Sequence, residues 1–349
     1  TRADACYNCH GTRLKVTGTD TRDTDAGELE SPVIDGWPNQ GVGRLNLDGS
    51  RGACSSCHTR HQFSIEMARK PYTCKECHVG PDVPAFKVYS ASKHGNIFSS
   101  MQNEWDFNAV PWTVGQDFQA PTCATCHISL TVNTDGDVIN QRTHRMSDRL
   151  GWRIFGLVYA HPQPKSPDTT IIRNQAGLQL PTNLDGSFAA DYLISTQEIA
   201  ARRTTMQRTC LACHDTSWTN GFFARLDNTI ETSNQSVLAA TQLMQGIWDA
   251  GYAKGLAGKG RIFDEYIERR WSDGWLLYAN NTRFVSAMAG GGDYGVFEDG
   301  RYHLTKSLMH MQDWKHTRDL IHKKEPPVRR SDWLASIIRA GAEWHRRRS

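Results

Sequence analysis

Residues 54–58 read Cys54-Ser-Ser-Cys57-His58, and residues 74–78 repeat the pattern as Cys74-Lys-Glu-Cys77-His78. In each stretch two residues separate a pair of cysteines, and a histidine follows the second cysteine directly. All ten cysteines of the 349-residue chain fall into such pairs, so the chain is organised around five copies of one motif. Motifs 2 and 3 are the two quoted; motifs 1, 4 and 5 are Cys6, Cys9 and His10, then Cys123, Cys126 and His127, then Cys210, Cys213 and His214.

The motif is typical of covalent attachment of c-type haem. Two cysteines three positions apart can each form a thioether to a vinyl group of the porphyrin, and the next residue can bind the iron. Zinc sites, disulfides and redox-active cysteine pairs also use this spacing. None of them requires a histidine after every pair, and only 14 of the 349 residues are histidine. The sequence therefore predicts five covalently bound haem c groups, with iron ligands His10, His58, His78, His127 and His214.

The composition agrees with a core that contains porphyrin. Only 38% of the residues are hydrophobic, which is little for a chain of this length. The 11 Trp, 10 Tyr and 12 Phe nevertheless argue against a disordered chain. Five porphyrins would supply much of the apolar interior that side chains otherwise provide.

Charge and hydropathy exclude two classes of protein. No segment approaches the roughly 18 consecutive apolar residues of a membrane-spanning helix. A net charge of +3 does not suit a nucleic-acid binder, and since each ferric haem adds about one negative charge, we expect the holoprotein to be slightly negative. Because thioether attachment takes place outside the cytoplasm, we expect an exported, periplasmic or extracellular protein whose precursor carries a signal peptide or a longer N-terminal part.

Nine histidines remain as candidates for the second axial position of the irons. An electron-transfer haem usually has a second strong ligand, whereas a catalytic haem keeps that position open. His61 lies too close to His58 to reach the far side of the same haem, so it would serve a neighbouring one. His61, His94 and His144 are the predicted second ligands, because they lie in the haem-dense part of the chain.

The motifs divide the chain into two predicted parts and indicate a mainly α multihaem cytochrome c with little β structure. Residues 1–220 would form a five-haem domain, and residues 221–349 a haem-free domain of long helices. Turn residues predict hairpins at 131–140 and 183–187. Apolar residues at helical spacing predict helices over 237–252 and 262–278, which pack either on the haem domain or against another subunit. A last helix is expected over 332–348, after Pro326-Pro327.

The order of motifs from Cys54 to His127 resembles that of the octahaem hydroxylamine oxidoreductase family. The similarity extends through Trp152 to motif 5 and, more loosely, to about Tyr294, and the five motifs match the last five of the family's eight. The residues that carry the resemblance are Cys57-His58-Thr-Arg-His61-Gln-Phe-Ser, Ala68-Arg-Lys-Pro71, Gly80-Pro-Asp82, Ser92-Lys-His94-Gly95, Ala120-Pro-Thr-Cys123 and Thr143-His144.

The resemblance implies that the haem on Cys6, Cys9 and His10 is the catalytic one. Asp82 matches an active-site aspartate of the family, but Val83 stands where hydroxylamine-oxidising members have a histidine, and Phe155 where they have a tyrosine. Tyr159 and His161 are the polar residues that could deliver protons instead. Oxidising members also cross-link a tyrosine to a neighbouring subunit's haem, for which Tyr294 is the nearest counterpart.

Two functions therefore remain open. The first is an oxidoreductase that acts on hydroxylamine or nitrite, with Asp82, Tyr159 and His161 as its catalytic candidates. The second is an electron carrier, alone or as part of a polymeric extracellular conduit, in which two histidines bind every iron. Either would exchange electrons with a partner cytochrome or a quinone-linked donor or acceptor, and we expect a homo-oligomer.

Overall fold

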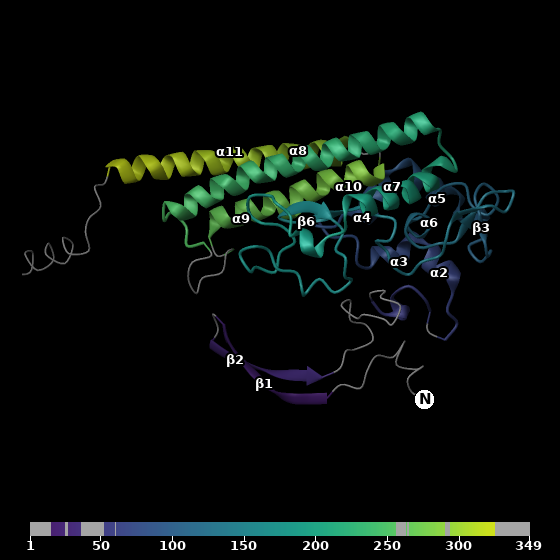
Figure 1. Ribbon diagram of the computed structural model, residues 1–349, viewed down its shortest axis with the longest axis horizontal. Coiled ribbons are helices and arrows are strands. Elements are labelled where there is room, and N and C mark those ends of the chain that lie inside the picture. The colour runs from purple at the N-terminus through teal and green to yellow at the C-terminus, as the bar shows by residue number, and fades with distance from the viewer. Residues whose placement is uncertain are drawn as a thin grey trace, which may run out of the picture.

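The computed structural model of the chain describes residues 15–24, 27–35, 52–59, 61–255, 263, 265–289 and 294–324. Within these residues helices predominate and strands are few and short (Figure 1), which confirms the predicted fold class. Motif 1, at Cys6 to His10, and the helix expected over 332–348 lie outside the described residues.

Short elements make up the part that carries motifs 2 to 5. Its helices have the bounds η1 (Cys54–Ser56), α2 (Ile65–Arg69), α3 (Pro71–Lys75), α4 (Ala85–Ala91), α5 (Lys93–Met101), η2 (Gln102–Glu104), α6 (Cys123–His127), η3 (Ala190–Tyr192) and α7 (Thr196–Leu211). Its strands are β3 (Trp112–Thr113), β4 (Thr131–Val132), β5 (Val138–Asn140), β6 (Trp152–Leu157) and β7 (Tyr159–Pro162). Helices of five to nine residues are unstable alone, so their positions depend on what they pack against.

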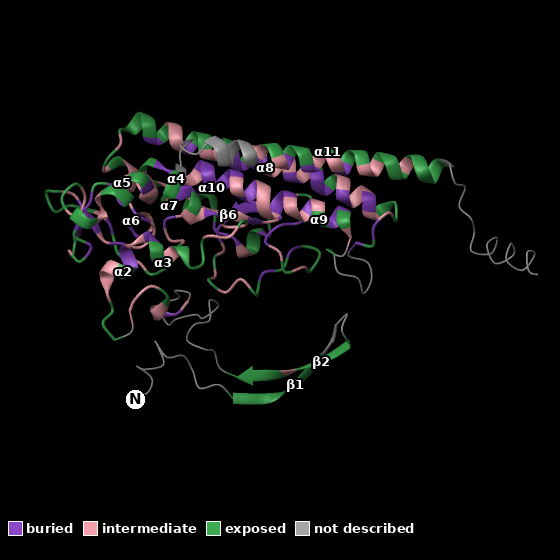
Figure 2. Cartoon of the chain, turned by 180° about the vertical axis from the view of Figure 1, so that it is seen from behind, coloured by how far each residue is buried: buried purple, intermediate pink, exposed green. Residues whose placement is uncertain are grey.

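Long helices form a layer along one side of this part (Figure 1). Their bounds are α8 (Thr216–Asp249), α9 (Tyr266–Asp273), the π-helix η4 (Gly274–Tyr278), α10 (Ala279–Ala289) and α11 (Tyr294–Lys324). The helical spacing seen over 237–252 and from Tyr266 onwards is confirmed, since Val237, Ala240, Met244 and Ile247 are buried at three- and four-residue intervals, as are Ile267, Trp271 and Trp275. Figure 2 shows that α8 and α11 turn exposed residues outwards and buried residues towards the layer's interior.

The helical layer packs on the motif-bearing part of the same chain. Val88 of α4 lies in one cluster with Phe284 and Val285 of α10. The boundary predicted at residue 220 falls inside α8, a single continuous helix. A division into two domains stays a prediction, and the two parts share that helix.

Both predicted hairpins are present. Strands β4 and β5 pair antiparallel, and the side chain of Asn133 accepts hydrogen bonds from the amides of Asp135 and Asp137 in the turn. Thr182 pairs with Phe188 around the second turn. The sequence did not predict the longest strands, β1 (Lys15–Thr24) and β2 (Gly27–Asp35), which pair with each other.

None of the helices in the described ranges is both long enough and apolar enough to cross a bilayer. This agrees with the hydropathy of the sequence.

Candidate functional site

The four described motifs adopt the same backbone conformation. In motifs 2, 3 and 5 the amide of the histidine donates to the carbonyl of the first cysteine at 2.9 Å, and motif 4 is helix α6. One helical turn places residues three apart on the same face, so both sulfurs of a motif can reach one porphyrin edge. The eight described cysteines are not joined in disulfides, which leaves every sulfur available for a thioether.

The zinc alternative has no geometric support among the described residues. A structural zinc ion needs four ligands in a tetrahedron, and none of the described Cys, His, Asp and Glu side chains gather in groups of three or more that could hold a metal. The donor set of each motif therefore fits a haem, to which the protein contributes two thioethers and an axial imidazole.

Two motif histidines are oriented as iron ligands would be. Nδ1 of His58 lies 3.1 Å from the carbonyl oxygen of Ser64, and Nδ1 of His127 lies 2.9 Å from that of Met146. A metal-bound histidine usually donates its other ring N–H to such an acceptor, which fixes the tautomer and the ring plane. Burial also lowers the pKa of His127, so its imidazole is neutral, the form that binds iron.

His94 faces the histidine of motif 5. The ring centres of His94 and His214 are 6.1 Å apart, and their planes are inclined by 50°. Two imidazoles that bind one metal from opposite sides, each through a nitrogen at about 2 Å, would have ring centres about 6 Å apart. Burial lowers the pKa of His94, and the neighbouring His214 lowers it further. The pair has the ring separation expected of two imidazoles that bind one iron from opposite sides.

The motifs follow one another in space as they do in the sequence. Burial, with smaller contributions from Cys74 and Cys77 of motif 3, raises the pKa of Cys57 in motif 2 to about 11. The thiols of Cys74 and Cys123, in motifs 3 and 4, interact through a hydrogen bond. Cys126 of motif 4 is in turn under the electrostatic influence of Cys210 in motif 5. Groups attached to motifs 2 to 5 would form a continuous row.

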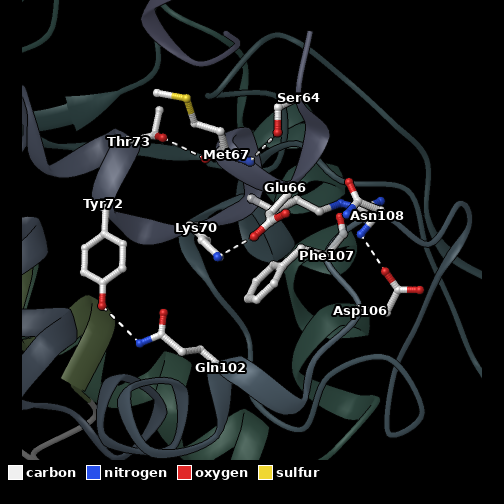
Figure 3. Close-up of polar contacts among 11 residues, drawn as sticks. Ser64, Glu66, Met67, Lys70, Tyr72, Thr73, Gln102, Asp106, Phe107 and Asn108 are labelled. Atoms are coloured by element: carbon white, nitrogen blue, oxygen red, sulfur yellow. Dashed lines mark hydrogen bonds and ion pairs between the residues drawn. The ribbon is translucent and has the colours of Figure 1, made fainter. Parts of the chain in front are cut away.

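A pocket of about 370 Å³ separates motifs 2 and 3. Its wall contains Ser56 of motif 2, Glu76 of motif 3 and residues of α2 and α3. Figure 3 shows the polar contacts around it: Nζ of Lys70 lies 2.5 Å from Oε1 of Glu66, and Gln102 donates to the Tyr72 hydroxyl. The first contact joins α2 to the residue that precedes α3, and the second joins α3 to η2.

The other two predicted second ligands lie at the surface of the described structure. His61 is exposed and has a positive φ of 66°. His144 is also exposed, two residues before Met146, whose carbonyl holds His127. Ligation by His61 and His144 stays a prediction.

Asp82 and its neighbour Val83 lie beside a hydrophobic cluster. Asp82 is half-buried, and its carboxylate approaches Gly80 so closely that a Cβ there would lie 2.6 Å from Oδ1. Val83 packs in the same cluster as Phe155. The two positions at which the resemblance implies a histidine and a tyrosine therefore pack against the same buried cluster, and both carry apolar side chains.

Tyr159 and His161 are buried in β7, with hydrogen bonds of their own. The Tyr159 hydroxyl donates to the carbonyl of Leu184 at 2.7 Å, and burial raises its pKa to about 12. His161 Nδ1 donates to the carbonyl of Pro162 at 2.7 Å, while Nε2 is buried with no hydrogen-bond partner. Burial lowers the pKa of His161 to about 4. Among the described residues, neither Tyr159 nor His161 is hydrogen-bonded to Asp82. With these pKa values, neither side chain would release a proton readily near neutral pH.

Two further residues contact the motifs and were missed in the sequence. The Trp218 ring stacks on the His214 imidazole, with ring centres 3.9 Å apart and planes 13° apart. Arg149 is buried and donates to the carbonyls of Thr125 and Cys126 in motif 4. The position of Trp218 four residues after His214 in a helix could have indicated the first contact. The contact of Arg149 with motif 4 has no local signal in the sequence, because Arg149 lies 22 positions after His127.

Two sequence-based comparisons agree with the motif geometry. A family model described as "seven times multi-haem cytochrome CxxCH" matches residues 43–148, which include motifs 2 to 4. A stretch of 87 residues is 44% identical to a "probable nitrite reductase-hydroxylamine oxidoreductase fusion protein" of Kuenenia stuttgartiensis. That match covers 22% of this chain and only 10% of the fusion protein.

Solved structures share the fold over most of the chain. A hypothetical multiheme protein is 38% identical, with a TM-score of 0.73, over 92% of this chain and 69% of its own. The reducing HAO-like protein complex of Kuenenia stuttgartiensis is 18% identical, with a TM-score of 0.57, over 77% of this chain and 61% of its own. The second similarity concerns the fold alone.

Proposed function

Because this chain belongs to the family of multihaem c-type cytochromes, we propose that it carries five covalently bound haem c groups and conducts electrons along them. The observation that carries the proposal is the row of motifs 2 to 5: α6, which is motif 4, contacts α3 and α7, which hold the first cysteines of motifs 3 and 5, and Cys57 of motif 2 lies near the cysteines of motif 3. The bound haems supply one-electron redox chemistry. The protein's own contribution is to hold them close together and out of water.

The chain's histidines would supply the axial ligands. His10, His58, His78, His127 and His214 are the proposed proximal ligands, one for each motif. His94 is the proposed second ligand of the iron bound to His214, supported by their ring separation. His61 and His144 would serve neighbouring haems. Two imidazoles on an iron leave no position for a substrate, so such haems transfer electrons only.

The setting follows from the chemistry of attachment. We propose export to the periplasm or beyond the cell, since haem c is attached outside the cytoplasm. A partner cytochrome or a quinone-linked protein would donate or accept the electrons, and the chain would form a homo-oligomer.

A second candidate function is oxidation or reduction of hydroxylamine or nitrite at the haem on Cys6, Cys9 and His10. The position of Asp82 favours it, because this carboxylate closely follows motif 3 and is only half-buried. Such a reaction moves several protons together with the electrons, and Asp82 would handle them. Val83 and Phe155 are apolar and pack against a hydrophobic cluster. These two residues favour the electron carrier instead.

Haem content and iron spin state test the proposal. A pyridine haemochrome assay is expected to give five haems per chain, and electron paramagnetic resonance of the oxidised protein only low-spin signals. If the assay gave no covalent haem, the proposal would be rejected. A high-spin signal that shifts when nitrite or hydroxylamine is added would instead favour the enzyme.

A variant tests the assigned ligand pair. His94→Ala is expected to convert one low-spin haem to high spin, because its iron loses an axial imidazole. His316→Ala is the matched control, since His316 is exposed on α11, in the haem-free part of the chain. An unchanged spin state in His94→Ala would remove His94 from the ligand set.

A further inference from the structure

Arg149 is a buried cation with uncharged hydrogen-bond partners. Its side chain is only 3% exposed. One guanidinium nitrogen donates to the carbonyls of Thr125 and Cys126 at 2.8 and 3.1 Å, and the other to those of Ser129 and Gln141 at 2.8 and 2.6 Å. Removing a positive charge from water in this way costs free energy. A buried charge of this kind therefore indicates a structural or electrostatic role.

The charge lies against motif 4. Thr125 and Cys126 immediately precede His127, the proposed iron ligand, and Ser129 follows it by two residues. Motifs 3 and 5, which are fully described, have no guanidinium on their backbone carbonyls. Motif 4 therefore differs from these two in having a buried guanidinium hydrogen-bonded to the carbonyls of its helical turn.

Two other charged residues modify the field of Arg149. The carboxylate of Asp148 offsets part of it, although its Oδ2 is already engaged by the Thr143 hydroxyl at 2.6 Å. Arg208 adds further positive charge. The balance of charge around motif 4 is positive.

A fixed cation changes how readily a nearby haem accepts an electron. Reduction of Fe(III) to Fe(II) adds one negative charge, which a neighbouring positive charge stabilises. Inside a protein the interaction is screened much less than at the surface. Charge and burial around the haem are among the means by which proteins set its reduction potential.

We propose that Arg149 raises the reduction potential of the haem on Cys123, Cys126 and His127 above that of its neighbours, so that electrons collect at this haem. The inference rests on the proposed function, since it requires haem at motif 4. Arg149 is a positioning residue for charge and does not touch a substrate. Motif 4 lies between motifs 3 and 5 in the row. The haem of motif 4 would therefore hold electrons in preference to the haems on either side of it.

The test is a mediated spectroelectrochemical titration of the purified holoprotein, in which a one-electron mediator donates each electron and each Fe(III) becomes Fe(II). In Arg149→Gln one transition is expected to move to lower potential while the others stay. Arg149→Lys should keep most of the parent's value, because it retains the charge but loses part of the hydrogen-bond network. Arg202→Gln is the matched control: Arg202 donates to Ser147 of the same loop, but its charge is paired with Glu198.

The proposal is overturned if Arg149→Gln titrates as the parent does, or if Lys and Gln lower the potential equally, since the lost hydrogen bonds would then be the cause. Should Arg149→Gln fail to fold, Asp148→Asn tests the same field, because removing that carboxylate should raise the same transition. No shift in Asp148→Asn would overturn it as well. Haem content is measured for every variant, so that absence of haem at motif 4, which contradicts the proposed function, is distinguished from a haem whose potential Arg149 does not affect.

Discussion

Single residues around the motifs determine how the iron ligands are held. His58 and His127 are fixed through Nδ1 by backbone carbonyls, whereas His214 is held by the face of Trp218. Trp218 in turn stacks on Phe222, with ring centres 5.6 Å apart. The orientation of the motif 5 imidazole thus depends on side chains of α8.

Replacing Trp218 should release the His214 ring. In Trp218→Leu we expect the low-spin resonance of one haem to shift or broaden, because the angle between the His94 and His214 planes is no longer restrained. A loss of about 1 kcal/mol in stability accompanies the loss of an aromatic pair. Electron paramagnetic resonance measures the first effect and thermal unfolding the second. Phe222→Leu keeps the inner ring pair, so its spectrum should match the parent's; an unchanged Trp218→Leu spectrum would contradict the role of Trp218.

His161 should make the protein less stable in acid. Its pKa lies at about 4 in the folded chain, below the ordinary 6.5, so between these values the unfolded chain binds a proton that the folded one does not. Stability therefore falls as the pH drops from 6.5 to 4, by about 3 kcal/mol in total. Denaturant unfolding of His161→Asn across this range should show a shallower slope than the parent, and parallel slopes would disprove the assignment.

Some helices and strands are held together by side chains that form the backbone hydrogen bonds a neighbouring strand would otherwise form. Asn234 of α8 accepts from the amide of Ala160 and donates to its carbonyl, at 3.0 and 2.9 Å, as a neighbouring strand would. Asn280 of α10 accepts from the amide of Gly156 at 2.9 Å. Arg283, fully buried, donates to both asparagines. The β6–β7 hairpin is fixed to the helical layer by this network.

Loss of one asparagine should loosen that hairpin. Asn234→Ala leaves the polar groups of Ala160 and one guanidinium nitrogen of Arg283 without a partner, which costs about 3 kcal/mol. Gln235→Ala changes an exposed neighbour on the same helix and should stay within about 0.5 kcal/mol of the parent. Chemical denaturation of the holoproteins compares the two. Equal stability of both variants would mean that the network does not hold the hairpin.

At the scale of the whole molecule, the haems would supply part of the hydrophobic interior. The motif-bearing part consists of short helices around a cluster of aromatic residues that includes Phe98, Trp105 and Trp112, and such helices need tertiary packing to persist. The helical layer has its own core, in which Met244, Ile247 and Trp271 are buried. Haem should therefore matter more for the first part than for the second.

Chain made without haem attachment should fold only in part. We expect residues 52–215 to be cut rapidly by a protease while fragments from α8 to α11 survive longer, because the helical layer has the larger apolar core formed by side chains alone. Limited proteolysis with mass spectrometry, compared with the holoprotein, measures this. Uniform resistance of the haem-free chain would contradict the proposed haem-dependent interior.

Local patterns predicted the elements that depend on neighbours in sequence. The motif turns need only the bond between residues four apart, the hairpin at 131–140 only its Asn and Gly, and the helices over 237–252 and 266–278 only the spacing of apolar residues. The β1–β2 hairpin was missed, because its sequence Lys15–Asp35 is mostly polar and is exposed on both faces (Figure 2).

The site shows the same division. Repetition of Cys, Cys and His predicted haem attachment, since the chemistry resides in five consecutive residues. It did not pair His94 with His214, place Trp218 on that ring or bring Arg149 to motif 4. Tyr159 and His161, the polar residues expected to deliver protons, are buried in β7, and that role stays a prediction.

The sequence by itself determined that this is a mainly helical chain organised around five haem motifs, because each motif is local and covalent. Only the tertiary structure decided which histidine faces which, which side chains surround Asp82, and where the buried cations lie. Those relations depend on contacts between residues far apart in the chain, and close packing of the whole molecule sets them.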